Sequence, residues 1–223
     1  MADKGIIGGI YTVMEWISRL VYLQFLWAIF TVIGLIGFGF FPATFAMFAV
    51  TRKWVRGQTD IALFPAFKQL YKKDFYKANV VGGISVAVGF ILYFYLRFFQ
   101  AQSGTASMVF FLLMFAICLL YLMTLFFIAP VFTHYDLKVI QLFKVSFMMT
   151  ISYPFHVISM TFILFCFALL MEAIPGLLPF FSFSYLAFAL MWIANLAIED
   201  KECHTMMTVR SNKPVKGRYR ALG

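Results

Sequence analysis

The sequence has few charged residues and lacks the best-known catalytic motifs. Charged side chains make up 12% of the 223 residues, against about 25% in a typical soluble domain. There is no GxxxxGK[ST] phosphate loop and no HExxH motif, so P-loop ATP hydrolysis and zincin-type proteolysis are excluded. No pair of carboxylates lies within an apolar run, which makes a coupled proton carrier hard to build. We therefore expect a protein that is not an enzyme and uses no cofactor.

Cysteine is scarce as well. The three cysteines, Cys118, Cys166 and Cys203, lie far apart and form no CxxC pair. Two of them fall in apolar runs, where cysteine usually acts as a small hydrophobic residue. This spacing indicates neither a disulfide framework nor a zinc site.

What the sequence has is long apolar runs, and 63% of its residues are hydrophobic. A bilayer core about 30 Å thick takes roughly 20 helical residues to cross. The runs are continuously apolar rather than alternating, which favours helices over a transmembrane barrel. We expect an all-α, polytopic transmembrane helical bundle. The runs without Asp, Glu, Lys or Arg are 20–51, 78–96, 98–135, 145–171 and 173–198.

The first run is too long for one straight crossing, since its helix would measure about 48 Å. It contains Gly34, Gly37, Gly39 and Pro42, and glycine and proline at this density interrupt helices. We expect a helix over 16–36, a turn through 37–41 and a shorter, proline-started helix returning to about Trp54. That gives six crossings. The alternative is one bent helix and five crossings.

The distribution of basic residues favours six crossings. Three segments, 51–77, 134–144 and 201–223, carry fifteen of the eighteen Lys and Arg residues, and positive charge accumulates on the cytoplasmic side. Six crossings leave only Arg97 outside, whereas five would also place Lys4 and Arg19 outside. We therefore expect both termini in the cytoplasm, one transmembrane domain over 1–200 and a disordered basic tail over 201–223.

Two segments on the cytoplasmic side are predicted to be interfacial amphipathic helices. In 60–77 an apolar stripe includes Phe67 and Tyr71, and in 136–147 the stripe is Leu137, Ile140, Phe143 and Phe147. Their basic residues either anchor the helices on anionic lipid or form a docking platform for a partner. The candidate docking residues are Arg52, Lys53, Arg56, Lys68, Lys72 and Lys73.

A few polar residues fall within or near the spans and are candidate intramembrane sites. His156 either carries a proton or ligand role or is hydrogen-bonded between helices. Arg97 and Glu172 either pair across the bundle, bind an anionic or sugar group, or reach the outer headgroups. Three amides, Gln24, Asn79 and Asn195, are expected to bridge helices by hydrogen bonds.

Several blocks of sequence resemble one family of bacterial membrane proteins. They are Trp16-Ile17-Ser18-Arg19-Leu20, Phe41-Pro42-Ala43-Thr44, Arg52-Lys53-Trp54-Val55-Arg56-Gly57 and Lys72-Lys73-Asp74-Phe75. Together they resemble the YesL family, over about residues 5–200. The resemblance implies a plasma membrane protein of a Gram-positive bacterium, encoded near sugar-uptake ATP-binding-cassette (ABC) systems. The family's biochemical role is not established, so the resemblance assigns no catalytic or ligand residue.

Two functions fit these expectations. The first is an accessory protein of a carbohydrate ABC-type uptake system, with permease subunits and anionic lipids as partners. The second is a small transporter or channel in its own right, which would need a polar midplane site at a broken helix. The break near Gly37–Pro42 is the best candidate for such a site. Neither function calls for nucleic acid, because topology accounts for the basic residues.

Overall fold

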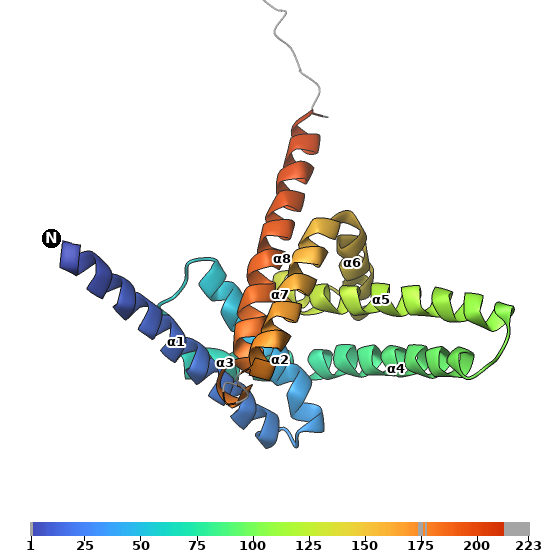
Figure 1. The fold of residues 1–223 in the computed structure, drawn as a ribbon. Coiled ribbons are helices and arrows are strands. Elements are labelled where there is room, and N and C mark those ends of the chain that lie inside the picture. The colour runs from blue at the N-terminus through green and yellow to red at the C-terminus, as the bar shows by residue number, and fades with distance from the viewer. Residues whose placement is uncertain (1, 174–175, 177, 212–223) are drawn as a thin grey trace, which may run out of the picture.

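A computed structural model of the chain describes residues 2–173, 176 and 178–211, with side chains for 8–173, 176 and 182–199. Its described residues form eight α-helices and no strand, as the apolar runs predict (Figure 1). The helices are α1 (Ala2–Ile33), α2 (Gly37–Val55), α3 (Leu63–Lys73), α4 (Phe75–Gln100), α5 (Thr105–His134), α6 (Val139–Ser152), α7 (Pro154–Ala173) and α8 (Leu178–Ser211).

Helices α1 and α2 form a tight hairpin. Leu35 and Ile36 turn the chain with φ of 58° and 57°. A Cβ atom on Gly34 would lie 2.3 Å from the Cα of Gly39, so the two helices meet here backbone to backbone. At the other end of the hairpin, the rings of Trp16 and Trp54 lie 5.8 Å apart, edge to face.

The hairpin confirms the expected break in the first apolar run. The alternative, in which this run forms one bent helix, is wrong. Two details of the prediction are wrong. The turn falls at 34–36 rather than 37–41, because the close approach of Gly34 and Gly39 sets its place. Pro42 lies inside α2 rather than at its start.

Helix α2 is the central helix of the fold. It contacts α1, α3, α4, α5 and α8, and ten of its 19 residues are buried. The ring of Trp27 on α1 stacks on Phe183 of α8 at 4.3 Å, and its indole Nε1 donates to Thr44 Oγ1 of α2 at 3.1 Å. Helices α1, α2 and α8 therefore form the packed centre of the molecule.

A buried amide fastens α1 to α8. Gln24 Oε1 accepts hydrogen bonds from the backbone N–H groups of Phe183 at 3.2 Å and Ser184 at 3.0 Å. Gln24 Nε2 lies 3.4 Å from Ser182 Oγ. This confirms the helix-bridging role predicted for Gln24. Asn79, by contrast, donates to the Phe75 carbonyl on its own helix.

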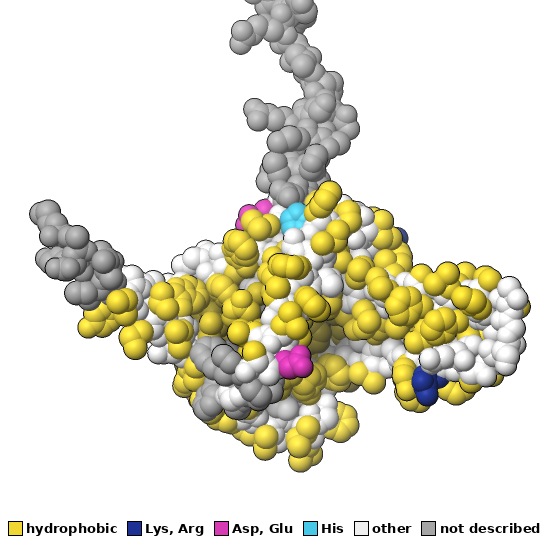
Figure 2. Space-filling view, viewed as in Figure 1, with side chains coloured by type: hydrophobic (Ala, Val, Ile, Leu, Met, Phe, Trp, Pro, Cys, Tyr) yellow, Lys and Arg dark blue, Asp and Glu magenta, His cyan; other side chains and the backbone are white. Residues whose placement is uncertain are grey.

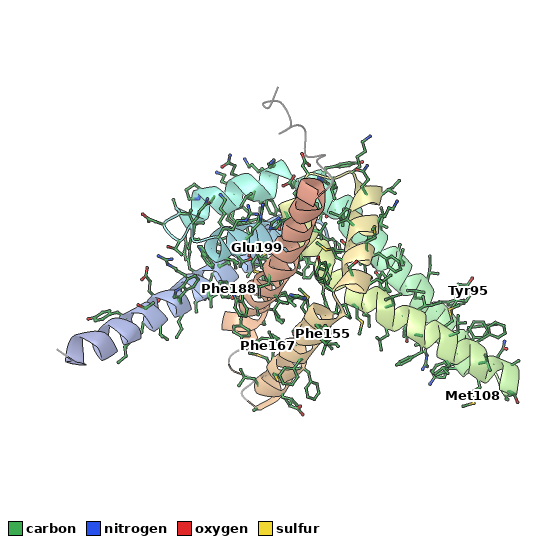
Figure 3. The ribbon with its side chains drawn as sticks, turned by 90° about the horizontal axis from the view of Figure 1, so that it is seen from above. Tyr95, Met108, Phe155, Phe167, Phe188 and Glu199 are labelled. Carbon is green, nitrogen blue, oxygen red and sulfur yellow. The ribbon has the colours of Figure 1, made fainter. Side chains whose placement is uncertain are left out.

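Helices α4 and α5 form a long hairpin that projects from this centre (Figure 1). Apolar side chains cover the hairpin in Figure 2. Figure 3 shows Tyr95 and Met108 near its far end, with exposed fractions of 46% and 74%. In water so much exposed apolar surface would be unfavourable, whereas in lipid it is the expected outer face.

Five helices are long and apolar enough to cross a bilayer. They are Gly8–Ile33, Phe75–Gln100, Thr105–His134, Pro154–Ala173 and Ser182–Glu199. Helix α2 is not among them. Its sequence includes glycine, proline, threonine and the basic residues Arg52 and Lys53, which make it less apolar than those five segments.

The first amphipathic helix forms, but its apolar face meets protein rather than lipid. Phe67 and Tyr71 of α3 are buried, and both rings lie 5.1 Å from that of Phe30 on α1. Burial raises the pKa of the Tyr71 phenol, whose hydroxyl donates to the Phe30 carbonyl at 3.3 Å. Phe64 on the same helix remains 48% exposed.

Two residues of the predicted apolar stripe of α6 lie on the outer surface, where lipid can cover them, and other residues of the helix pack on the protein. Leu142 and Met149 are buried, while Ile140 and Phe147 are exposed. The helix packs chiefly on α5, and Ser146 belongs to its buried stripe. In lipid the large apolar residues can face outward, so they did not reveal the packed side.

Two further boundaries differ from the expectation. The run 145–171 is divided at Tyr153, between the end of α6 and Pro154 at the start of α7. Helix α8 continues to Ser211, into the segment expected to be disordered. Residues 212–223 lie outside the described part of the chain.

Candidate functional site

A pocket of about 300 Å³ lies where α2, the α3–α4 junction and the end of α5 meet. We call it the basic pocket. Its apolar floor includes Pro42, Phe45 and Ala46 of α2, and the ring of Phe45 stacks on that of Phe132 at 4.2 Å. The charged and polar residues around it are Arg52, Lys53, Lys73, Asp74, Lys77, Thr133, His134 and Asp136.

The pocket carries a formal excess of two positive charges, because four Lys and Arg residues face two carboxylates. Lys77 Nζ is 2.8 Å from Asp136 Oδ1, and this hydrogen bond lowers the pKa of the Asp136 carboxyl. The Asp136 side chain is 98% exposed, so the pair contributes little to stability. Lys53 and Lys73 have no carboxylate within 4.0 Å among the described side chains.

Arg52 joins α2 to α5 at the edge of the pocket. Its guanidinium donates to the backbone carbonyl of Thr133, one of the last carbonyls of α5. A helix C-terminus carries partial negative charge, which a nearby cation stabilises. Arg52 is therefore a structural clamp as well as a pocket residue.

A chain of hydrogen bonds continues from Arg56 into α8. Arg56 Nη2 is 3.3 Å from His134 Nε2 and 3.5 Å from Nδ1. His134 Nε2 is in turn 3.2 Å from Asn195 Oδ1. Asn195 Nδ2 then donates to Glu199 Oε1 at 2.6 Å; Glu199 is labelled on α8 in Figure 3.

This series of hydrogen bonds favours one tautomer of the His134 ring. Arginine has only donors, so the ring nitrogen facing Arg56 accepts. Because the Asn195 amide nitrogen donates to Glu199, its Oδ1 is left to accept from a protonated Nε2 of His134. With the proton on Nε2, only Nδ1, 3.5 Å from Arg56 Nη2, is left to accept from Arg56; the nearer Nε2, at 3.3 Å, is then a donor and cannot. The helix-bridging role predicted for Asn195 is confirmed.

The six candidate docking residues fall into two groups. Lys53 and Lys73 line the basic pocket together with Arg52, and Arg56 lies beside it on His134. Lys68 and Lys72 lie outside the pocket lining, on the exposed side of α3. The predicted cluster is therefore a pocket and a separate exposed pair.

The three candidate intramembrane residues do not form a site together. Arg97 is exposed and its Nη1 donates to Gln100 Oε1 at 3.1 Å on the same helix. Glu172 is exposed at the end of α7, and neither residue belongs to the two ion pairs found between described side chains. His156 packs against Tyr153 with ring centres 5.7 Å apart.

Sequence reasoning missed His134 and Asp136 as site residues. Both end the apolar run that becomes α5, where a single histidine drew no attention. The predicted topology could have indicated them, because it places the end of the apolar run 98–135 on the same side of the membrane as Arg52 and Arg56.

The fold and its apolar surface define a multi-pass α-helical membrane protein with a basic pocket between its helices. The chain belongs to the YesL-like family matched by the description "Protein of unknown function, DUF624", over residues 20–96. It is 32% identical over 207 residues to "Uncharacterized protein YteU" of Bacillus subtilis (strain 168), covering 92% of this chain and 91% of that protein.

Two other proteins of Bacillus subtilis (strain 168) are similar. "Uncharacterized protein YesL" is 33% identical over 139 residues, covering 62% of this chain and 65% of that protein. "Uncharacterized protein YesV" is 30% identical over 197 residues, covering 86% and 93%. No solved structure matches the chain.

Proposed function

We propose that this protein is an accessory membrane protein of a carbohydrate ABC-type uptake system and catalyses no reaction itself. The observation that carries the proposal is the exposed pair Lys68 and Lys72 on α3, beside the helix face that is held by buried Phe67 and Tyr71. The carbohydrate system is inferred from the resemblance to the YesL family, whose members tend to be encoded near such systems.

The anchoring of α3 gives the pair a fixed position. Residues four apart on a helix lie on one face with Cβ atoms about 6 Å apart. An acidic helix of a permease subunit would offer carboxylates at the same spacing. Anionic lipid headgroups would also attract these lysines, by about 1 kcal/mol each. The experiment therefore has to distinguish binding to a permease subunit from attraction to lipid.

The proposal places the protein in the plasma membrane with both termini in the cytoplasm. In support, hydrogen bonds join the basic end of α2 to the end of α5 and to α8. Trp16 of α1 lies at this end too. The positive-inside rule then makes it the cytoplasmic end.

Reporter fusions test this orientation. A reporter enzyme placed after Ala2 is expected to give a cytoplasmic signal, and one inserted after the exposed Ile36 in the α1–α2 turn an external signal. Signals from the same side at both places would contradict the proposed topology.

Copurification tests the function. The protein is tagged at its C-terminus, expressed from its own locus during growth on plant polysaccharide, crosslinked in intact cells and purified in mild detergent. We expect permease subunits of a sugar importer to copurify. Lys68→Glu with Lys72→Glu is expected to abolish their recovery.

The matched control is Lys138→Glu with Lys144→Glu, the same charge reversal at two exposed lysines at and near the start of α6. If both double variants lose the permease equally, a general attraction to anionic lipid explains the result instead. If the unaltered protein is recovered alone even after crosslinking, the accessory role is wrong. Uptake assays in liposomes would then test the alternative, a transporter or channel in its own right.

A further inference from the structure

A second cavity lies beside the basic pocket, between α2, α4 and α5. It measures about 370 Å³, and we call it the apolar cleft. Its walls are almost wholly apolar and include Phe41, Phe45, Gly82, Gly89, Tyr121 and Ile128. Val86 and Leu122 also line it and are 60% and 51% exposed, so the cleft opens to the outer surface of the bundle.

The apolar cleft and the basic pocket are adjacent. Phe45 lines both of them. On α4, Lys77 belongs to the pocket and Gly82 and Gly89 belong to the cleft. The helix from Lys77 to Gly89 is about 18 Å long at the standard rise. Pocket and cleft therefore follow one another along the same helices.

Two glycines on α4 shape the cleft. A Cβ atom on Gly82 would lie 2.1 Å from the ring of Phe41, so only glycine lets that ring pack against α4. A Cβ atom on Gly89 would meet Tyr121 at 3.5 Å, an ordinary contact. The Tyr121 hydroxyl donates to the Ser85 carbonyl, which satisfies its polar group within the protein wall and keeps the cleft apolar.

The geometry points to a binding site for one anionic glycerophospholipid, with its phosphate at Lys53 and Lys73 and one acyl chain in the apolar cleft. Neither lysine has a carboxylate within 4.0 Å among the described side chains, although the charge of Lys73 acts on Asp136 across the pocket. A phosphate there gains charge-assisted hydrogen bonds. The cleft lacks polar partners for a sugar or a peptide, and it opens where acyl chains surround the protein.

The headgroup half is tested with purified protein that has been stripped of lipid in mild detergent. Native mass spectrometry then counts retained lipid after addition of phosphatidylglycerol, or of phosphatidylcholine with the same chains. We expect one retained phosphatidylglycerol and at least about tenfold weaker retention of phosphatidylcholine. Lys53→Glu with Lys73→Glu should weaken phosphatidylglycerol binding by at least about tenfold, the scale for two basic residues near a headgroup.

Lys68→Glu with Lys72→Glu is the matched control, because it makes the same charge change outside the pocket. If the two double variants lose phosphatidylglycerol binding equally, a general attraction of the basic surface explains the binding and the proposed site is wrong. Equal binding of both lipids would overturn it as well. Thermal unfolding in detergent checks that the pocket variant remains folded; if it does not, Lys53→Gln alone is measured and is expected to show part of the loss.

The acyl-chain half is tested with Gly89→Leu, which adds a side chain at the cleft wall. Binding of long-chain phosphatidylglycerol should fall several-fold, whereas the dihexanoyl form should be unaffected. Gly83→Leu is the control, since a Cβ atom there meets nothing within 4 Å. Equal effects of the two leucines, or binding of free glycerol phosphate as tight as that of the whole lipid, would overturn a site with an acyl chain.

These results are independent of the proposed accessory role. Lipid retention is measured on purified protein without a permease, and permease recovery depends on Lys68 and Lys72. A negative result for the lipid site therefore does not contradict the accessory role, and a negative result for the accessory role does not contradict the lipid site.

Discussion

The α1–α2–α8 centre and the α4–α5 hairpin differ in how far their helices are buried, and the more exposed helices are the more apolar ones. In an apolar 18-residue stretch of each helix, 50% of residues are buried within the protein in α8, against 11% in α4 and 17% in α5. Yet α5 is an almost uninterrupted run of apolar residues, whereas the buried α2 contains glycine, proline, threonine and two basic residues. In a membrane the most apolar helix therefore faces lipid, and small or polar residues mark the packed interior.

The largest effect is expected where α1 and α2 touch backbone to backbone. A Cβ atom on Gly39 would lie 2.4 Å from the Thr31 carbonyl oxygen, so Gly39→Leu must separate the two helices. Overpacking costs about 1–3 kcal/mol and occasionally more, and we expect the upper end or loss of folded protein. Thermal unfolding in detergent measures it.

Gly37→Leu is the matched control, because a Cβ atom at Gly37 meets nothing within 4 Å. Similar destabilisation by both leucines would show that the contact between α1 and α2 is not the reason.

The second prediction asks whether the exposed hairpin is in lipid. Phe115 lies near the middle of α5 and is 49% exposed. An arginine at the middle of a lipid-facing helix costs about 2.5–3.5 kcal/mol. Phe115→Arg should reduce insertion or stability accordingly, as measured by yield in membranes and unfolding in lipid nanodiscs.

Met108→Arg, close to the start of α5, should be far milder because its side chain can reach the headgroups. If Phe115→Arg is equally mild, the outer face of the hairpin is not covered by lipid.

The third prediction concerns the buried amide in the centre. Gln24→Leu leaves the N–H groups of Phe183 and Ser184 without this acceptor. The expected cost is about 1–3 kcal/mol, measured as a lower unfolding temperature. Asn79→Leu is the comparison, since the Asn79 side chain donates to the Phe75 carbonyl on its own helix. A larger effect at Asn79 would reverse the assignment of which amide joins helices.

The smallest effect is expected at the rim of the basic pocket. The pKa of Asp136 is lowered in the folded protein by its hydrogen bond with Lys77. Its stabilising contribution is therefore present above the ordinary pKa of an aspartate and is lost as pH falls through the lowered value.

Asp136→Asn should accordingly lower the unfolding temperature slightly at neutral pH, and the difference should vanish in acid. A difference that grows on acidification would show that another group pairs with Lys77.

The sequence predicted the features that depend on composition and on strong local signals. The helical class, the break before α2 and the bridging by Gln24 and Asn195 follow from apolar length, glycine and isolated amides. The packed faces of α3 and α6 did not follow, because a stripe of large apolar residues fits lipid and protein equally well.

The basic pocket was predicted only in part. Lys53 and Lys73 were identified through their charge, but their separation from Lys68 and Lys72 depends on α3 packing along α2 and α1. His134 and Asp136 become neighbours of these residues only when the end of α5 meets α2. The predicted topology places these segments on the same side of the membrane, but no local pattern in the sequence shows that they come into contact.

The central place of α2 also bears on how the chain is made. Helix α2 leaves the ribosome before α4, α5 and α8, which later enclose it. Until they arrive, its less apolar surface and the basic residues at its end have only α1 and α3 beside them. The contact of Gly34 with Gly39 involves only α1 and α2, so this hairpin can form before the later helices are synthesised. The α1–α2 hairpin is then the surface on which the later helices pack.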